Sequence, residues 1–328
     1  EIIEAEMAAM GHSVIEVARQ PNGDWKIDQN GRLNRRLTAL ATPIRISGPA
    51  AGHPRLRTSE DPTGRNVVGT LNNCGGGVTP WGTILICEEN FNATFSGSAD
   101  TTPEAENHKR YGIDGPSRFS PAWAKHFPRF DIEQEPNEPN RFGWVVEFNP
   151  MNSRSRPVKR TALGRCKHEG AGIITNHDGR VVVYCGDDER FEYVYRFVTR
   201  RAFNPDKPRA NRNLLDDGTL SVAKFNDAGT VSWLPLVFGT GPLTKENGFE
   251  SQADVLIETR QAADLLGATP MDRPEDVEPS AVNGCVYVIL SNNSKRSADQ
   301  TEAANPRPHN THGHVLELIP KKTESGFD

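Results

Sequence analysis

The chain has 328 residues and a formal net charge of -5 at pH 7, and 35% of its residues are hydrophobic. This length can form one large domain or two ordinary ones. The negative charge argues against a nucleic-acid partner, because no basic field would attract a phosphate backbone. No apolar run is long enough for a membrane-spanning helix, so we expect no membrane partner. The chain begins at Glu1 rather than Met, so we expect an upstream segment to have been removed or not included.

The sequence opens with a helical pattern and continues mainly as short strands. We expect a helix at residues 1–10 and a second one at residues 259–266. Apolar or alternating runs predict strands at residues 13–19, 25–27, 83–88, 143–148, 171–175, 181–185, 193–198, 220–225, 231–235, 286–291 and 313–319. Turn residues such as Asp178-Gly179 and Asp227-Ala228-Gly229 predict that two successive pairs of these strands form hairpins.

Residues 92–140 differ from the rest of the chain, because they are rich in Pro, Glu, Asn and Ser. We predict that this segment is a loop-rich excursion inserted within the domain. Such an excursion either roofs a site or covers the edge of a sheet, and the sequence leaves both interpretations open.

Many short strands separated by turns indicate an all-β fold, which includes sandwiches, barrels and propellers. Polar clusters recur beside the ends of the predicted strands along much of the chain. This recurrence favours a propeller, in which every blade delivers loops to one central axis, although no clear internal repeat is visible. We therefore predict an all-β fold, a β-propeller with few short helices, in which residues 1–328 form a single domain.

The chain has five cysteines and no Cys-x-x-Cys pair, which argues against a structural zinc site. Cys87, Cys185 and Cys285 lie within apolar runs, so we expect them to be small core residues. Cys74 precedes three glycines, where we predict a turn. Its thiol is either a thiolate ligand of a metal or a half-buried group beside a flexible turn.

Acidic residues lie beside the ends of two of the predicted strands. Glu88 and Glu89 are adjacent, so they point to opposite faces of an extended chain, and one of them would face a site while the other makes an ion pair or meets solvent. Glu169 is flanked by small residues and is a better ligand candidate than His168, which we expect at the surface or behind the ligands.

Two further clusters contain several charges each. Asp187-Asp188-Glu189 is either a charged turn or a calcium-binding loop, because carboxylates are the ligands that Ca²⁺ selects. In the segment Arg273–Glu278, Arg273 and Glu275 share one face of an extended chain. The planar fork of Arg273 suits a phosphate or a carboxylate, whereas the structural alternative is a surface ion-pair network.

Taken together, these segments resemble the PhoX-type alkaline phosphatases. The resemblance is carried by residues 69–83, 87–91, 168–171, 184–190 and 272–278, which read GTLNNCGGGVTPWGT, CEENF, HEGA, YCGDDER and DRPEDVE. It implies a monomeric β-propeller that hydrolyses small-molecule phosphate monoesters with Fe³⁺ and Ca²⁺. It also implies export through a twin-arginine leader, and hence a periplasmic or secreted location.

The same resemblance implies a role for individual residues. The implied iron ligands are Cys74, Glu169 and Glu275. The implied ligand shared by iron and calcium is Glu89, the calcium ligand is Asp188, and the group that holds the phosphate is Arg273. Further acidic candidates near these positions are Glu88, Asp187 and Glu278. Family members continue with a strand-rich segment that supplies another acidic ligand, and we expect this chain to lack that segment.

Two other functions are compatible with the same clusters. A non-catalytic calcium-binding propeller could serve as an interaction scaffold, and a calcium-dependent propeller could hydrolyse lactones or other esters. Calcium alone gives no reason for a thiolate, whereas iron accepts both sulfur and oxygen ligands.

Overall fold

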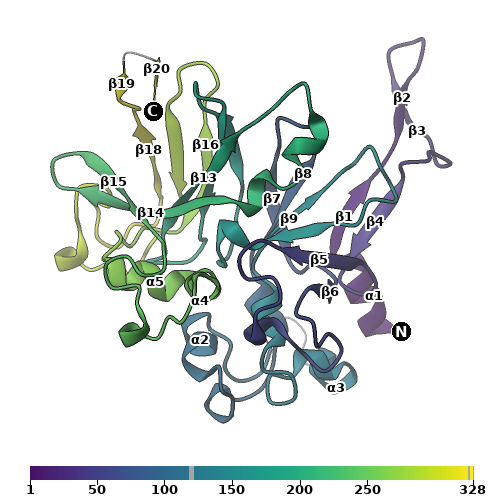
Figure 1. The fold of residues 1–328 in the computed structure, drawn as a ribbon, viewed down its shortest axis with the longest axis horizontal. Coiled ribbons are helices and arrows are strands. Elements are labelled where there is room, and N and C mark those ends of the chain that lie inside the picture. The colour runs from purple at the N-terminus through teal and green to yellow at the C-terminus, as the bar shows by residue number, and fades with distance from the viewer. Residues whose placement is uncertain (118–121, 324–325, 328) are drawn as a thin grey trace.

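The computed structural model describes residues 1–117, 122–323 and 326–327 of the chain (Figure 1). Strands predominate in this part of the chain, as the sequence predicts, and the α-helices are few and short. The helices are α1 (Ile2–Ala9), α2 (Ala105–Arg110), α3 (Ala122–His126), α4 (Gln252–Ile257) and α5 (Thr259–Leu266). Among the described residues, no helix is both long and apolar enough to cross a membrane.

The largest sheet has six described strands in the order β6-β5-β10-β9-β8-β7. These are β5 (Pro43–Ser47), β6 (Asn66–Val68), β7 (Asn73–Val78), β8 (Ile84–Glu88), β9 (Val145–Phe148) and β10 (Val158–Arg160). Leu85 and Cys87 point from β8 into one core and Ile86 into another. Both faces of β8 are therefore covered, which explains its continuous apolar run.

A second sheet is a five-stranded antiparallel meander within the described chain. Its strands are β11 (Gly172–Thr175), β12 (Arg180–Gly186), β13 (Val194–Ala202), β14 (Gly218–Asn226) and β15 (Thr230–Pro235). Both predicted hairpins are confirmed, because β11 pairs with β12 and β14 pairs with β15. The turn glycines Gly179 and Gly229 have φ values of 79° and 75°, a backbone region that most residues avoid.

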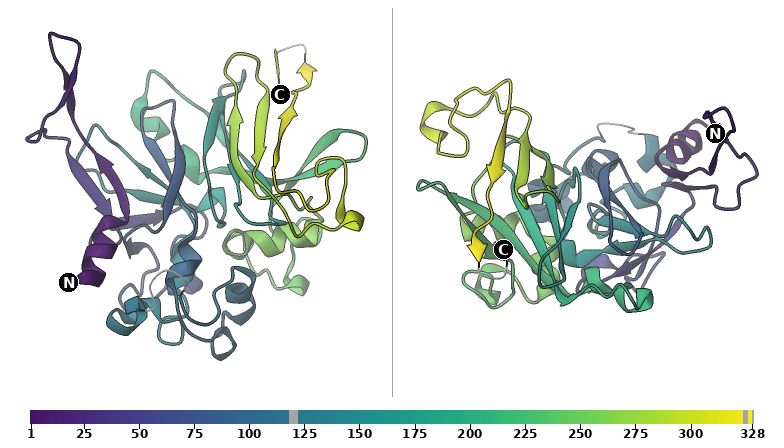
Figure 2. Two further views of the ribbon diagram at one scale, coloured as in Figure 1. Left: turned by 180° about the vertical axis from the view of Figure 1, so that it is seen from behind. Right: turned by 90° about the horizontal axis from the view of Figure 1, so that it is seen from above.

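The third sheet has three described strands, β16 (Pro274–Pro279), β17 (Val286–Leu290) and β18 (His314–Leu318). Smaller pairs are formed by β1 (Gly11–Val14) with β4 (Arg35–Thr38), β2 (Val17–Arg19) with β3 (Trp25–Ile27), and β19 (Lys322–Thr323) with β20 (Gly326–Phe327). The β2–β3 hairpin projects from the body, whereas α2–α5 lie together at the opposite side (Figures 1 and 2).

Glycines allow the inner edges of the three large sheets to approach backbone to backbone. A Cβ atom at Gly77 in β7 would lie 2.1 Å from the carbonyl oxygen of Ala171, just before β11. A Cβ atom at Gly172 in β11 would lie 2.1 Å from the carbonyl oxygen of Val277 in β16. No side chain fits such gaps, so glycine is required at both positions. The three sheets therefore converge along β7, β11 and β16.

Three hydrophobic clusters fill the spaces between these layers. The first joins the six-stranded sheet to α1 and residues 92–140, the second joins the six- and five-stranded sheets to α4 and α5, and the third lies between the five- and three-stranded sheets. Cys87, Cys185 and Cys285 are buried, as predicted.

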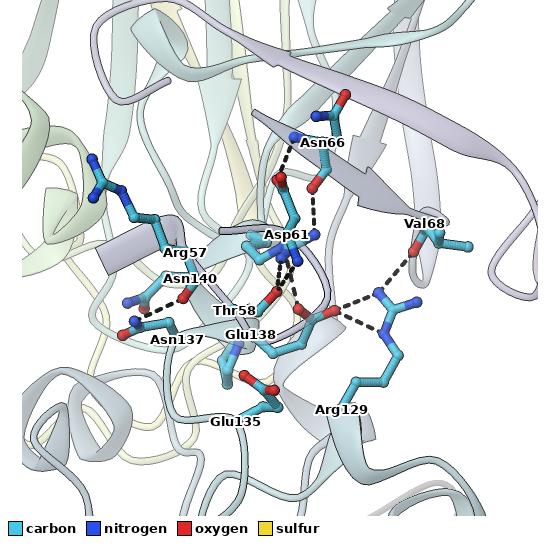
Figure 3. A network of polar contacts seen from close by, with 12 residues as sticks. Arg57, Thr58, Asp61, Asn66, Val68, Arg129, Glu135, Asn137, Glu138 and Asn140 are labelled. Atoms are coloured by element: carbon cyan, nitrogen blue, oxygen red, sulfur yellow. Dashed lines mark hydrogen bonds and ion pairs between the residues drawn. The ribbon is translucent and has the colours of Figure 1, made fainter. Parts of the chain in front are cut away.

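Residues 92–140 form short helices and loops that pack against the body, apart from residues 118–121, which lie outside the described chain. Figure 3 shows one of the networks that fasten this segment. Arg129 Nε donates to Glu138 Oε1 over 2.8 Å, and Arg129 Nη2 donates to the carbonyl oxygen of Val68 over 2.8 Å. Asn137 Nδ2 donates to the carbonyl oxygen of Arg57 over 2.9 Å. The segment is thus tied to residues 57–68 by side-chain to backbone bonds.

The prediction of a turn around Cys74 is wrong. Residues 73–78 form β7, which pairs with β8 and has an irregular register between Asn73 and Gly76. Glycine is depleted in strands, which is why the pattern indicated a turn. The glycines are present here because neighbouring strands approach the backbone too closely for any side chain.

Candidate metal centre

Five of the predicted ligands come together where the three sheets converge. Cys74 comes from β7 and Glu275 from β16, and the other three come from the ends of neighbouring segments. Two overlapping groups have ligand atoms that all lie within 4.8 Å of one another, namely Cys74, Glu89 and Glu169, and Glu169, Asp188 and Glu275. Glu169 belongs to both groups, so it lies at the middle of the cluster.

Backbone hydrogen bonds hold the ligand-bearing loops side by side. The N–H of Glu89 donates to the carbonyl oxygen of Asn72 over 3.2 Å, which ties the end of β8 to the start of β7. The N–H of Glu169 donates to Gly186 over 3.2 Å, and the N–H of Asp188 donates to Lys167 over 3.0 Å. The ligands therefore sit on a rigid frame rather than on free loops.

Negative groups outnumber positive ones among the described residues of the cluster, where four carboxylates and a thiol adjoin the guanidinium of Arg273. The thiol of Cys74 donates to Glu169 Oε1 over 2.9 Å. Burial, followed by this bond and the charge of Glu169, raises the pKa of Cys74 to about 12. Burial, followed by the charges of Asp188 and Glu169, raises the pKa of Glu89 to about 7. Burial also raises the pKa of Glu169 and that of Asp188. Like charges crowded in this way favour either protonation or a bound cation.

One buried atom supports the second possibility. Asp188 Oδ1 is buried and has no hydrogen-bond donor among the described residues. A buried carboxylate oxygen without a partner is costly, and a metal ion would satisfy it. The donor set of one sulfur and several carboxylate oxygens fits a metal centre with both soft and hard ligands.

Arg273 lies immediately before β16, beside this cluster. Its Nη2 atom is 2.7 Å from Asp188 Oδ2 and 3.1 Å from Glu275 Oε1. These neighbours raise its pKa against the opposing effect of burial. Its φ of 57° is in the left-handed region, which costs roughly 1–2 kcal/mol for a residue with a side chain. Strain of this kind is concentrated at functional sites.

Three further candidates lie apart from the cluster. Glu88 is fully buried, and its carboxylate accepts bonds from Lys159 Nζ at 2.7 and 3.0 Å and from three backbone N–H groups. Asp187 is paired with Arg260, whose Nη2 lies 2.5 Å from Asp187 Oδ1. Glu278 is exposed on β16 and belongs to neither ligand group. None of these three belongs to either ligand group, and within the Asp187–Glu189 segment only Asp188 does.

Sequence reasoning missed two buried cations near the cluster. Lys167 Nζ lies 2.8 Å from Glu189 Oε2, and Arg260 Nη1 lies 3.0 Å from the same atom. A signal for Arg260 was available, because it shares a face of α5 with Ala263, which is buried. His168, expected at the surface or behind the ligands, is fully buried, and its Nε2 lies 2.9 Å from the carbonyl oxygen of Gly164.

A strand-rich fold whose sheets converge on a thiol, four carboxylates and an arginine has the composition of a metal centre that receives an anion. The chain belongs to the alkaline phosphatase PhoX family, whose sequence profile matches residues 1–327.

A solved structure is similar over most of the chain. It is Pseudomonas fluorescens PhoX in complex with vanadate, a transition state analogue, with 47% sequence identity and a TM-score of 0.89. The match covers 93% of this chain and 54% of the other, so the chain spans about half the length of that relative. A search of curated proteins found no match.

Proposed function

We propose that the protein hydrolyses phosphate monoesters at the cluster around Glu169. One observation carries this proposal. Two sets of ligand residues, the first with a thiol and two carboxylates and the second with three carboxylates, share Glu169 and lie beside Arg273. Membership of the PhoX family supports it, and so does the vanadate bound to the similar P. fluorescens protein.

We further propose that Fe³⁺ and Ca²⁺ occupy this centre. Cys74, Glu89 and Glu169 would hold iron, because a thiolate is a ligand for iron and not for calcium. Glu169, Asp188 and Glu275 would hold calcium, because carboxylate oxygens suit a hard cation. The proximity of the ligand atoms supports this grouping. It differs from the resemblance, which implies that Glu275 is an iron ligand and that Glu89 is shared by iron and calcium. When bound, such ions act as Lewis acids that neutralise charge on a phosphoryl group and activate water.

Arg273 is proposed to hold the phosphate. In the described part of the chain the printed contacts of Arg273 with carboxylates come from Nη2. Nη1 and the second N–H of Nη2 lie along one edge of the guanidinium and would donate to two oxygens of an anion. A planar fork matches phosphate in this way and stabilises the negative charge that develops in the transition state. The ion pairs to Asp188 and Glu275 fix the side chain before substrate arrives, which lowers the entropic cost of binding.

Membership of the family also supports proposals about the fold, the domain organisation, the oligomeric state and the location of the protein. The three sheets that converge along β7, β11 and β16 would be blades of a propeller. Residues 1–328 would form a single domain, with residues 92–140 as the excursion within it. The protein would act as a monomer on small-molecule substrates, in the periplasm or after secretion.

The test is hydrolysis of p-nitrophenyl phosphate by the purified chain, with p-nitrophenyl acetate and a simple lactone assayed in parallel. We expect turnover of the phosphate ester, inhibition by vanadate and loss of activity after chelation. Turnover of the lactone alone would favour an esterase. Metal binding without turnover of any substrate would favour a calcium-binding scaffold.

A further inference from the structure

A buried ion pair lies directly behind two of the proposed ligands. Arg260, from α5, contacts Asp187 through two atoms, with Nε 2.7 Å from Oδ2 and Nη2 2.5 Å from Oδ1. Both side chains are almost completely buried, at 1% and 0% exposure. Neither residue belongs to a ligand group, so the pair has a role other than direct metal binding.

Asp187 connects the two loops that present Glu169 and Asp188. Its Oδ1 atom accepts the N–H of Lys167 over 3.1 Å, and Asp187 forms an isolated antiparallel bridge with His168. The N–H of Asp188 returns a bond to the carbonyl oxygen of Lys167 over 3.0 Å. The side chain of Asp187 therefore sets the spacing of the two loops. The residues that follow the bridged pair, Glu169 after His168 and Asp188 after Asp187, are the proposed ligands.

Arg260 fixes this bridge from behind. Besides Asp187 it contacts Glu189, with Nη1 3.0 Å from Oε2, and its guanidinium lies 5.0 Å from the ring centre of Tyr111. Glu189 also holds the Lys167 side chain. Tyr111 belongs to the excursion at residues 92–140, so Arg260 joins the excursion, α5 and both ligand loops at one point.

We propose that the Arg260–Asp187 pair positions Glu169 and Asp188 for metal binding before any metal is present. The inference rests on the proposed function of the cluster. A guanidinium that makes a two-atom contact fixes the direction of a carboxylate, whereas an ammonium supplies only a point charge. Partners that orient the ligands of a metal typically change its affinity by about 10- to 100-fold when they are replaced.

The experiment is a calcium titration of the chelator-treated full chain by calorimetry, comparing Arg260→Lys with Arg160→Lys. Arg160 is a matched control, because it is also buried and paired, with Nε 2.7 Å from Glu147 Oε2. It lies in β10, separated from β7 by β9 and β8. We expect calcium to bind about 10- to 100-fold more weakly to Arg260→Lys and with nearly unchanged affinity to Arg160→Lys. Equal affinity in both variants would overturn the inference.

Arg260→Gln separates position from charge. Removing a cation near a metal site strengthens metal binding if only electrostatics matter. If Arg260 acts by positioning, this variant binds calcium more weakly than the wild-type protein. Tighter binding would contradict the proposal.

Amide hydrogen exchange of the metal-free wild-type protein tests the inference without any variant. We expect the N–H groups of Lys167, Glu169 and Asp188 to be protected as strongly as those in β12. Fast exchange that slows only after calcium is added would show that metal, and not the ion pair, orders these loops. A wild-type protein that binds no metal yet shows protected amides would count against the proposed function and leave the positioning inference standing.

Discussion

Glu88 and Glu89 are adjacent residues for which the structure predicts opposite behaviour. Glu88 is fully buried against Lys159, whereas Glu89 lies in the metal-ligand cluster. Replacing each in turn by Gln removes one charge at nearly constant volume. The pair therefore provides a matched comparison within a single peptide.

Glu88→Gln should strongly destabilise the protein. It leaves Lys159 as a buried cation without a charged partner, although Lys159 Nζ keeps its bond to the carbonyl oxygen of Arg141 over 2.8 Å. Breaking a buried ion pair by removing one partner costs about 3–5 kcal/mol. With an unfolding entropy of about 2.1 cal/mol/K per residue, this corresponds to a fall in Tm of roughly 4–8 °C for a chain of this length. The metal content of the folded fraction should be unchanged.

Glu89→Gln should stabilise the metal-free protein at pH 8. The pKa of Glu89 is raised to about 7 in the folded state from 4.5, so the unfolding free energy falls as pH rises through this interval. The shift sets an upper limit of about 3 kcal/mol, and access of water to part of the site reduces the effect to about 1–2 kcal/mol. The variant should lose this gain at pH 4, where the native carboxyl is protonated, and it should bind less metal at pH 8.

The assay is urea denaturation of chelator-treated proteins at pH 4 and pH 8, followed by elemental analysis after metal is restored. The reasoning is refuted if Glu88→Gln is as stable as the wild-type protein but loses metal. It is also refuted if Glu89→Gln destabilises the metal-free protein at pH 8 and retains all of its metal.

Three further outcomes are expected. Cys74→Ser should lose iron as measured by elemental analysis. Cys285→Ser alters a buried thiol just before β17 that belongs to neither ligand group, so it should retain iron at a cost of about 1 kcal/mol or less. Arg273→Lys should lower kcat/KM for p-nitrophenyl phosphate by roughly 10- to 1,000-fold, because the charge remains but the fork is lost; near-normal turnover would remove Arg273 from the phosphate site. Gly77→Ala should unfold or lose about 3 kcal/mol in urea denaturation, because its Cβ meets the carbonyl oxygen of Ala171. Gly229→Ala, in open space at a turn, should cost only about 1–2 kcal/mol.

Local patterns predicted the strands well. Val181, Val183 and Cys185 belong to a continuous apolar run, which is typical of a buried strand. Turn residues between the paired strands, such as Asp178-Gly179, identified both hairpins. The strands that were missed, such as β5 and β10, are short and carry arginine or lysine in the run. Their place in a sheet is decided by neighbours distant in sequence, as in the parallel pairing of β10 with β5.

The site was predictable by residue type but not by orientation. Adjacent glutamates must point to opposite faces. The sequence does not show, however, that Lys159, 71 residues away, forms an ion pair with Glu88 and not with Glu89. Likewise, Asp187 and Asp188 look equivalent until Arg260 is found behind the first of them. Long-range ion pairs therefore decided which of two neighbouring carboxylates reaches the cluster.

The most direct test of the central claim is the metal content of the purified wild-type chain, measured by mass spectrometry without added metal. If the cluster holds iron at its thiol-bearing group and calcium at its all-carboxylate group, both elements should be present at about one ion or more per chain, and zinc should be nearly absent. A folded protein that carries zinc alone, or neither iron nor calcium, would contradict the claim.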